Sequence, residues 1–168
     1  MGRQKAFSLV ELLIVVVLLG ILAAIVLPKF SNASAVARAS MLADTLRLFR
    51  TQLPVFEAQH RGVAAGYPDG DTSATPTEAT FVLHMTKASN DSFQTAEPGT
   101  PGFDYGPYMR RIPENPINEK NTVKIIANNE AFPDDGDNSY GWIYQPATLL
   151  FKADSPGTDD NGKAYFDY

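Results

Sequence analysis

The sequence predicts an α+β protein in which a small antiparallel β-sheet packs on the distal half of one long N-terminal helix. Three observations predict this fold. An apolar run covers residues 7–27, and from residue 35 to residue 56 apolar residues recur at helical spacing. Further along, residues 122–127 and 141–152 are rich in β-branched and aromatic residues. A helix and a sheet that each have one apolar side pack those sides together.

The apolar run from Phe7 to Leu27 has the length of a membrane-spanning helix. Its 21 residues rise roughly 31 Å, which matches the hydrocarbon thickness of a bilayer. Gly20 is well tolerated in such helices. We therefore predict a transmembrane helix over residues 7–28, preceded by a short basic segment, residues 1–6.

Glu11 is the most informative residue of this run, because it is the one charge in an otherwise apolar helix. A charge at the centre of a membrane helix costs about 2.5–3.5 kcal/mol on insertion scales. A carboxylate in apolar surroundings becomes neutral unless an opposite charge stabilises its ionised form. The sequence therefore predicts that Glu11 has a functional partner.

Three interpretations of the N-terminus compete. A plain signal anchor explains the length of the run and leaves Glu11 without a role. A secretory signal peptide cleaved after Ala35 would release a soluble secreted domain, but the apolar core of such peptides usually has about 7–15 residues. The third interpretation is a short leader that is cleaved on the cytoplasmic side, just before Phe7.

Residues 5–30 closely resemble the N-termini of type IV pilins and type II secretion pseudopilins. Four positions carry the resemblance: Phe7, Glu11, Gly20 and Pro28. The resemblance implies that a prepilin peptidase removes the leader, residues 1–6, and methylates the new N-terminus at Phe7. It also implies one pass through the inner membrane, with the distal domain outside the cytoplasm. Ala6 departs from the family pattern, which usually has glycine before the cleaved bond.

Cleavage before Phe7 would create an ammonium group in or near an apolar medium. We hypothesise that Glu11 of one subunit pairs with the Phe7 amine of a neighbouring copy during filament assembly. Removing one partner of a buried ion pair typically costs about 3–5 kcal/mol. Loss of Glu11 should therefore leave the protein in the membrane and out of filaments.

The helix is predicted to continue as an amphipathic extension over residues 29–61. An apolar seam at helical period marks it: Ala35, Ala39, Leu42, Leu46, Phe49, Leu53 and Phe56. Pro28 is expected to kink or open the helix just beyond the membrane, because proline lacks an N–H. Pro54 lacks an N–H for the same reason, so the helix should bend at Pro54 or end near Leu53.

Residues 62–168 are predicted to form the distal globular domain. Residues 62–76 have the composition of a loop. Thr75 to Glu78 has the pattern of a capping box with Pro76 at the first helical position, which predicts a short helix to about Lys87. After an irregular connection over residues 90–121, residues 122–127 should form a strand. A hairpin should follow, with strands near 142–145 and 149–152 and a turn at 146–148.

The distal domain also resembles the major pseudopilins, through residues 106–108, residues 112–116 and the hairpin. The fold implied is pilin-like. Many type IV pilins close their distal loop with a disulfide, and this chain has no cysteine, which favours a pseudopilin. The absence of cysteine also excludes thiol catalysis, iron–sulfur clusters and cysteine-based zinc sites.

The distal half of the chain is acidic. Residues 64–168 carry sixteen acidic and seven basic residues, which argues against nucleic acid as a partner. Two acidic loops, residues 134–138 and 154–161, offer the oxygen ligands that calcium prefers, without the spacing of an EF-hand. The resemblance to major pseudopilins implies a calcium site in the second loop, with three candidate ligands: Asp154, Asp159 and Asp160.

The sequence carries no catalytic motif of a common hydrolase, phosphate-binding or metalloprotease type, so we expect a structural protein rather than an enzyme. The resemblance implies a subunit of a helical homopolymer in a type II secretion pseudopilus. The subunit would be anchored in the inner membrane, and the filament would lie in the periplasm. The resemblance further implies the following partners: prepilin peptidase, an assembly platform and ATPase, minor pseudopilins and membrane lipid. A type IV pilin for adhesion, motility or DNA uptake is the alternative within the same class.

Overall fold

The computed structural model describes the backbone of residues 8–168, and the side chains of residues 8–24 and 34–168. The chain forms two compact units, Met1–Ala37 and Arg38–Tyr168. The predicted leader, residues 1–6, and Phe7 lie outside the described residues, as does the side chain of Pro28.

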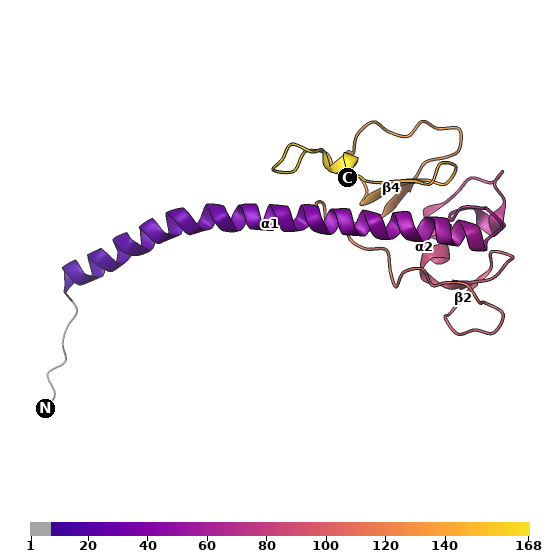
Figure 1. The fold of residues 1–168 in the computed structure, drawn as a ribbon, viewed down its shortest axis with the longest axis horizontal. Helices are drawn as coiled ribbons and strands as arrows, with labels where there is room; N and C mark the ends of the chain where they lie inside the picture. Colours follow the sequence, from indigo (N-terminus) through magenta and orange to yellow (C-terminus); the bar gives the residue numbers. More distant parts are fainter. Residues whose placement is uncertain (1–7) are drawn as a thin grey trace, which may run out of the picture. The chain divides into compact units, whose positions relative to one another are not determined.

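Helix α1 (Leu9–Gln59) is the longest element of the chain (Figure 1). Its backbone stays helical through Pro28 and Pro54, so the helix does not end near Leu53. The side chain of Pro54 is exposed, while Leu53 and Phe56 on either side are buried in the core. Packing of these two side chains offsets the hydrogen bond that Pro54 cannot donate, because most helical stability in proteins comes from tertiary contacts.

Among the described residues, no helix combines the length and the hydropathy that crossing a bilayer requires. The predicted membrane segment, residues 7–28, extends beyond the described side chains at both of its ends.

The predicted apolar seam of α1 forms the part of the helix that is buried in the core of the second unit. Six of its seven residues are buried: Ala39, Leu42, Leu46, Phe49, Leu53 and Phe56. Phe49 lies at the centre, where its ring stacks on Phe151 at 3.9 Å between centroids and contacts Trp142 at 5.5 Å. The heptad-like apolar spacing therefore predicted the buried face of the helix correctly.

Helix α2 (Glu78–Thr86) begins two residues later than the predicted capping box implies. Thr77 is the N-cap, and its hydroxyl accepts the N–H of Thr80 at 3.2 Å. Pro76 is buried in the extended segment before the helix. The prediction of a Thr75–Glu78 box was wrong because the Glu78 carboxylate is engaged elsewhere, with the N–H of Val123 at 2.7 Å. A short 3₁₀ helix, η1 (Pro68–Gly70), interrupts the preceding loop.

The second unit contains two sheets. Strands β1 (Ala88–Ser89) and β2 (Thr95–Ala96) form an antiparallel pair, and β2 lies inside the segment, residues 90–121, that was predicted to be irregular. The larger sheet has the order β3-β4-β5, and its members are β3 (Val123–Ile125), β4 (Trp142–Gln145) and β5 (Leu150–Ala153). A second 3₁₀ helix, η2 (Tyr165–Asp167), follows near the C-terminus.

The larger sheet is mixed rather than wholly antiparallel. The predicted hairpin is present, with Tyr144 opposite Phe151 in an antiparallel pair of strands. Strand β3 instead pairs with β4 in parallel, with Val123 opposite Trp142. The connection over residues 126–141 returns the chain to the start of the sheet, which parallel pairing requires. The predicted α+β class is confirmed, and the antiparallel description holds for β4 and β5.

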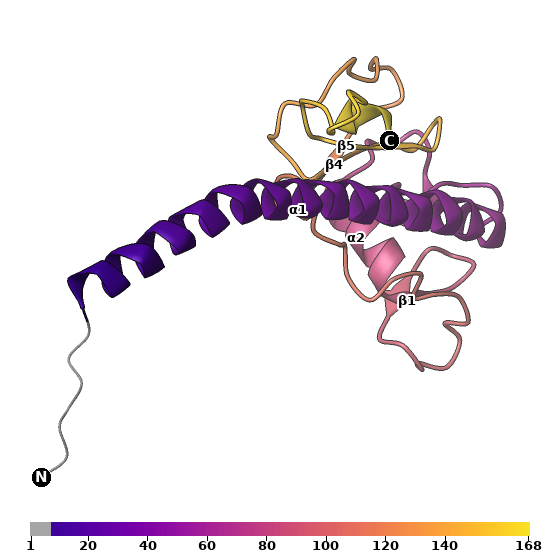
Figure 2. The same ribbon diagram turned by 60° about the vertical axis from the view of Figure 1, so that its left-hand side comes forward.

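The two sides of α1 carry different elements in the second unit. In both views, α2 and the β1–β2 pair lie below α1, and β4 with the long β3–β4 connection lies above it (Figure 1, Figure 2). The aromatic core between them joins α2 to the sheet, since Phe81 of α2 contacts Tyr144 of β4 at 4.9 Å between ring centroids.

Candidate functional site

The N-terminal part of α1 presents apolar side chains on every face. Between Leu9 and Leu22 each large apolar side chain is 50–82% exposed. A helix that is apolar all round is normally buried, either in a membrane or in a large protein core. Exposed apolar surface of this extent marks a site of interaction with lipid or with other proteins. This part of the chain is therefore a candidate assembly helix.

Glu11 takes part in a reciprocal cap at the start of α1. The N–H of Ser8 donates to Glu11 Oε2 at 3.4 Å, and the N–H of Val10 donates to Ser8 Oγ at 3.3 Å. A serine N-cap with a glutamate three residues later is a capping box, which satisfies N–H groups that lack partners within the helix. The Ser8-x-x-Glu11 pattern directly before an apolar run is the sequence signal of this cap, which was not among the roles predicted for Glu11. The pairing of Glu11 with Phe7 remains a prediction, because Phe7 lies outside the described residues.

A buried asparagine organises the distal domain. Asn115 is fully buried, and its Nδ2 donates to the carbonyl of Gly141 at 2.7 Å and to Ser155 Oγ at 3.0 Å. Its Oδ1 accepts the N–H of Ile117 at 2.9 Å. Asn115 lies in the 112–116 segment of the predicted resemblance, and it connects that segment to the residue before β4 and to the side chain of Ser155 just after β5.

Asp154 accepts hydrogen bonds from the backbone at and just after the first acidic loop, residues 134–138. The side chain is fully buried, and its two oxygens accept the N–H groups of Asp137 and Tyr140, each at 2.7 Å. Asn118 Nδ2 donates to the carbonyls of Tyr140 and Asp154, each at 2.8 Å. Buried polar groups with all their partners in place fix one arrangement of the surrounding backbone.

The three candidate calcium ligands lie in different settings. Asp154 is occupied by backbone N–H groups, and Asp160 is exposed. Asp159 Oδ1 accepts the N–H groups of Asn161 at 2.8 Å and Lys163 at 2.9 Å, while its Oδ2 accepts the hydroxyl of Tyr168. The hydrogen bond from Tyr168, followed by that from Lys163, lowers the pKa of Asp159. Within the described part of the chain, no three His, Cys, Asp or Glu residues are grouped to hold a metal ion.

Two buried histidines surround Phe56. The Phe56 ring stacks on His60 at 3.9 Å and on His84 at 4.9 Å between centroids. His60 Nδ1 bonds to the carbonyl of Phe56 at 2.9 Å, and the N–H of Gly66 donates to His84 Nδ1 at 3.3 Å. Burial, and then the charge of His60, lower the pKa of His84 to about 4. The side chain of His84 is buried and packed in this core.

The family comparison matches the N-terminal segment. Residues 1–27 match the model of the prokaryotic N-terminal methylation motif. The chain carries a prokaryotic N-terminal methylation motif. The motif contains the predicted cleavage position between Ala6 and Phe7 and also contains Glu11.

A relative supports the same resemblance over a longer part of the chain. The chain is 28% identical over 117 residues to the type II secretion system core protein G of Klebsiella pneumoniae. The match covers 69% of this chain and 71% of that protein. No solved structure matches. Together the motif and this relative confirm the predicted resemblance to the pseudopilins of type II secretion.

Proposed function

We propose that this protein is a structural subunit of a type II secretion pseudopilus. It is cleaved before Phe7, methylated at the new N-terminus, and assembled into a helical filament through residues 7–28. The observation that carries the proposal is an all-round apolar helix that begins inside a methylation motif. The relative in Klebsiella pneumoniae, named as a core protein of type II secretion, supports the choice of secretion system.

The apolar surface of α1 explains why such a subunit needs two environments. Burial of apolar surface stabilises by about 25 cal/mol per Å². Side chains such as Leu9 and Leu22 expose more than half of their surface in the single chain. Membrane lipid covers this surface before assembly, and the helices of neighbouring copies cover it in the filament core. The subunit is therefore stored in the inner membrane, with its distal domain in the periplasm.

Glu11 has a different partner in each state. In the single chain it caps α1 at Ser8. In the filament its carboxylate pairs with the methylated amine of Phe7 from a neighbouring copy. Both contacts are charge-assisted hydrogen bonds, and in the filament the donor is ionised as well as the acceptor. Assembly thus replaces an internal cap with a contact between subunits.

The proposal includes the machinery that handles the subunit. Prepilin peptidase cleaves and methylates it, and an inner-membrane platform with its ATPase extracts it from the membrane. Minor pseudopilins complete the filament. The role is structural rather than enzymatic, which agrees with the absence of a catalytic motif from the sequence.

The second acidic loop is proposed to bind calcium through oxygens of residues 154–160. The exposed carboxylate of Asp160 is open to an incoming ion. Calcium binds six to eight oxygen ligands, and backbone carbonyls contribute to many of its sites. Binding requires Asp159 to exchange one of its present hydrogen bonds for the metal.

The mature N-terminus tests the proposal directly. Mass spectrometry of the protein from its native host should find N-methylated Phe7 as the first residue. A chain that begins at Val36, or that retains residues 1–6, would contradict the proposal. The variants Glu11→Ala and Glu11→Gln should stay in the membrane fraction and be absent from sheared filaments, whereas the cap variant Ser8→Ala should still assemble.

A further inference from the structure

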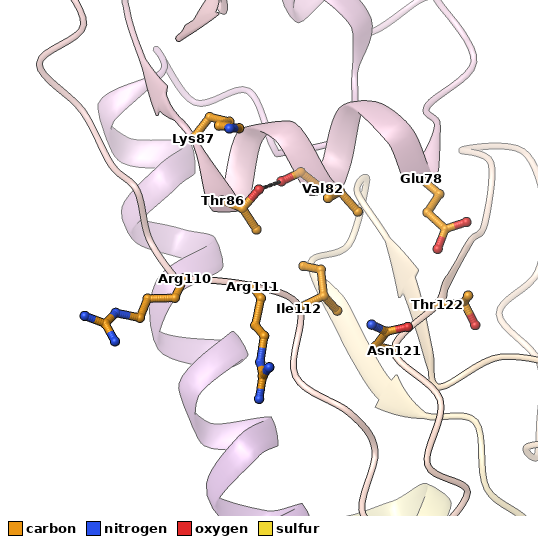
Figure 3. A pocket seen from close by; sticks show the side chains of 9 residues that line it. All are labelled: Glu78, Val82, Thr86, Lys87, Arg110, Arg111, Ile112, Asn121 and Thr122. Atoms are coloured by element: carbon orange, nitrogen blue, oxygen red, sulfur yellow. Dashed lines mark hydrogen bonds between the residues drawn. The ribbon is translucent and has the colours of Figure 1, made fainter. Parts of the chain in front are cut away.

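A basic pocket lies beside α2, on the otherwise acidic distal domain. The pocket has a volume of about 450 Å³. Nine residues line it: Glu78, Val82, Thr86, Lys87, Arg110, Arg111, Ile112, Asn121 and Thr122. In Figure 3, Lys87 lies at the C-terminal end of α2, and Arg110 and Arg111 extend from the neighbouring segment. Glu78 lies at the opposite end, where its carboxylate is bonded to Val123.

Two of the three positive charges of this pocket, those of Arg110 and Arg111, have no acidic partner among the described residues. Three of the seven basic residues in the distal half line it. Lys87 pairs with Glu97, but neither arginine forms an ion pair or a hydrogen bond with another described residue. The segment that carries the arginines is fixed, because the N–H of Met109 donates to the carbonyl of Met85 at 3.0 Å and Ile112 is buried. The two guanidinium groups are thus held at an exposed surface without an acidic partner.

The acidic residues of the same domain differ in how many hydrogen bonds their carboxylate oxygens already accept within the subunit. Asp159 uses both carboxylate oxygens, and Asp137 accepts the N–H of Ser139. Asp134 forms no hydrogen bond or ion pair with the described residues, and Asp135 uses one oxygen for the N–H of Gly136. Asp134 and Asp135 are both exposed. They form a pair of adjacent carboxylates that matches the pair of adjacent arginines.

We propose that the pocket at Arg110 and Arg111 binds the Asp134–Asp135 loop of a second copy of this chain. Guanidinium and carboxylate groups form paired, charge-assisted hydrogen bonds, which fix orientation as well as adding stability. Val82 and Ile112 add apolar surface to the lining of the same pocket. This inference rests on the proposed function, because it assigns a contact between neighbouring subunits.

The positions of the two surfaces explain why their contact would build a filament. Helix α2 lies below α1, and the β3–β4 connection that contains Asp134 lies above it, in both views (Figure 1, Figure 2). A contact between two different surfaces of identical subunits is heterologous, and such contacts generate open helical assemblies unless the rotation closes a ring. Complementary charges at such an interface set the register of the subunits more than the total affinity.

Cross-linking of the full chain in its native host tests the contact. The chain has no cysteine, so the double variant Arg111→Cys/Asp134→Cys forms disulfides only at the engineered positions. We expect a ladder of linked subunits in filaments of the double variant and at most background dimers in each single variant. Filaments of the double variant that yield no ladder would overturn the proposal.

Charge reversal provides the second test. Arg110→Glu/Arg111→Glu and Asp134→Arg/Asp135→Arg should each lose filament assembly, and the combined four-residue variant should regain it. Arg61→Glu/Lys163→Glu changes the net charge equally outside the pocket and should assemble normally. Thermal unfolding of each variant checks that the domain is folded. Full assembly of either reversed variant, or no recovery in the combined variant, would overturn the proposal.

The outcome also separates this inference from the proposed function. If the wild-type chain is processed at Phe7 and forms filaments while the reversed variants assemble equally well, only the pocket contact is wrong. If the wild-type chain forms no filaments, both the contact and the proposed function are wrong.

Discussion

The carboxylate of Glu78, in the first turn of α2, accepts the N–H of Val123 at the start of β3 at 2.7 Å. The two residues are 45 positions apart in the sequence. Val123 is buried, with 1% of its surface exposed. This hydrogen bond therefore satisfies the backbone donor of a buried residue, and it fixes α2 against the edge of the mixed sheet.

Replacement of Glu78 should destabilise the distal domain. In Glu78→Ala the buried N–H of Val123 has no acceptor, which costs about 1–3 kcal/mol. Glu78→Gln keeps an acceptor oxygen and should cost less. Urea unfolding of the full-length protein in detergent, followed by Trp142 fluorescence, measures both variants. Equal stability of Glu78→Ala and the wild type would contradict this role.

Asp154→Asn should disturb the loop over residues 134–140. An asparagine side chain can accept the N–H of only one of Asp137 and Tyr140, and its NH₂ group would face the other donor. We expect a loss of about 1–3 kcal/mol in the free energy of unfolding. Asp160→Asn removes a charge at an exposed position and should stay within about 0.5 kcal/mol of the wild type. A similar loss in both variants would argue against a special role for Asp154.

Gly141→Ala should be strongly destabilising for a steric reason. A Cβ atom at position 141 would lie 2.1 Å from the carbonyl oxygen of Lys120. The backbone at this point must move, and Gly141 also donates to Thr122 and accepts from Asn115. We expect a clear drop in the melting temperature of the distal domain. Gly20→Ala is the matched control, because its added Cβ meets nothing within 4 Å.

Acidification should destabilise the distal domain through His84. Burial lowers its pKa in the folded state to about 4, from 6.5 in the unfolded chain. The unfolded state therefore binds more protons between these values, so stability is complete above pH 6.5 and falls as the pH drops toward about 4. A shift of this size corresponds to on the order of 3 kcal/mol. The lowered pKa of His60 acts in the same direction.

The variant His84→Gln identifies the contribution of this group. Glutamine retains an oxygen that can accept the N–H of Gly66 and does not titrate. Its melting temperature should fall less than that of the wild type between pH 7 and pH 4.5. An unchanged pH profile would show that His84 does not cause the acid sensitivity.

Calcium should raise the melting temperature of the full-length protein if residues 154–160 hold the ion, because a ligand that binds only the folded state stabilises it. The double variant Asp159→Ala/Asp160→Ala should lose this response, and magnesium should reproduce it only weakly, since magnesium demands a more rigid octahedral site. No increase at millimolar calcium would remove calcium from the proposal.

The sequence predicted those features that depend on residues close together in the chain. The spacing of Leu42, Leu46 and Phe49 gave the buried face of α1, and the hairpin followed from two β-rich segments around Pro146. The Ser8-x-x-Glu11 cap belongs to the same local class, and its pattern was visible before the structure. Each of these patterns lies within one continuous stretch of the chain, so it can be recognised without knowledge of distant residues.

The tertiary structure alone decided the contacts between distant segments. The parallel pairing of β3 with β4, the later start of α2, and the burial of Asp154 all depend on groups that meet only when the chain has folded. Glu78 illustrates the reason. Its sequence neighbours suggest a helix cap, but the unsatisfied N–H of Val123 lies within reach in the folded domain, and a buried donor without an acceptor costs more than a helix cap gains.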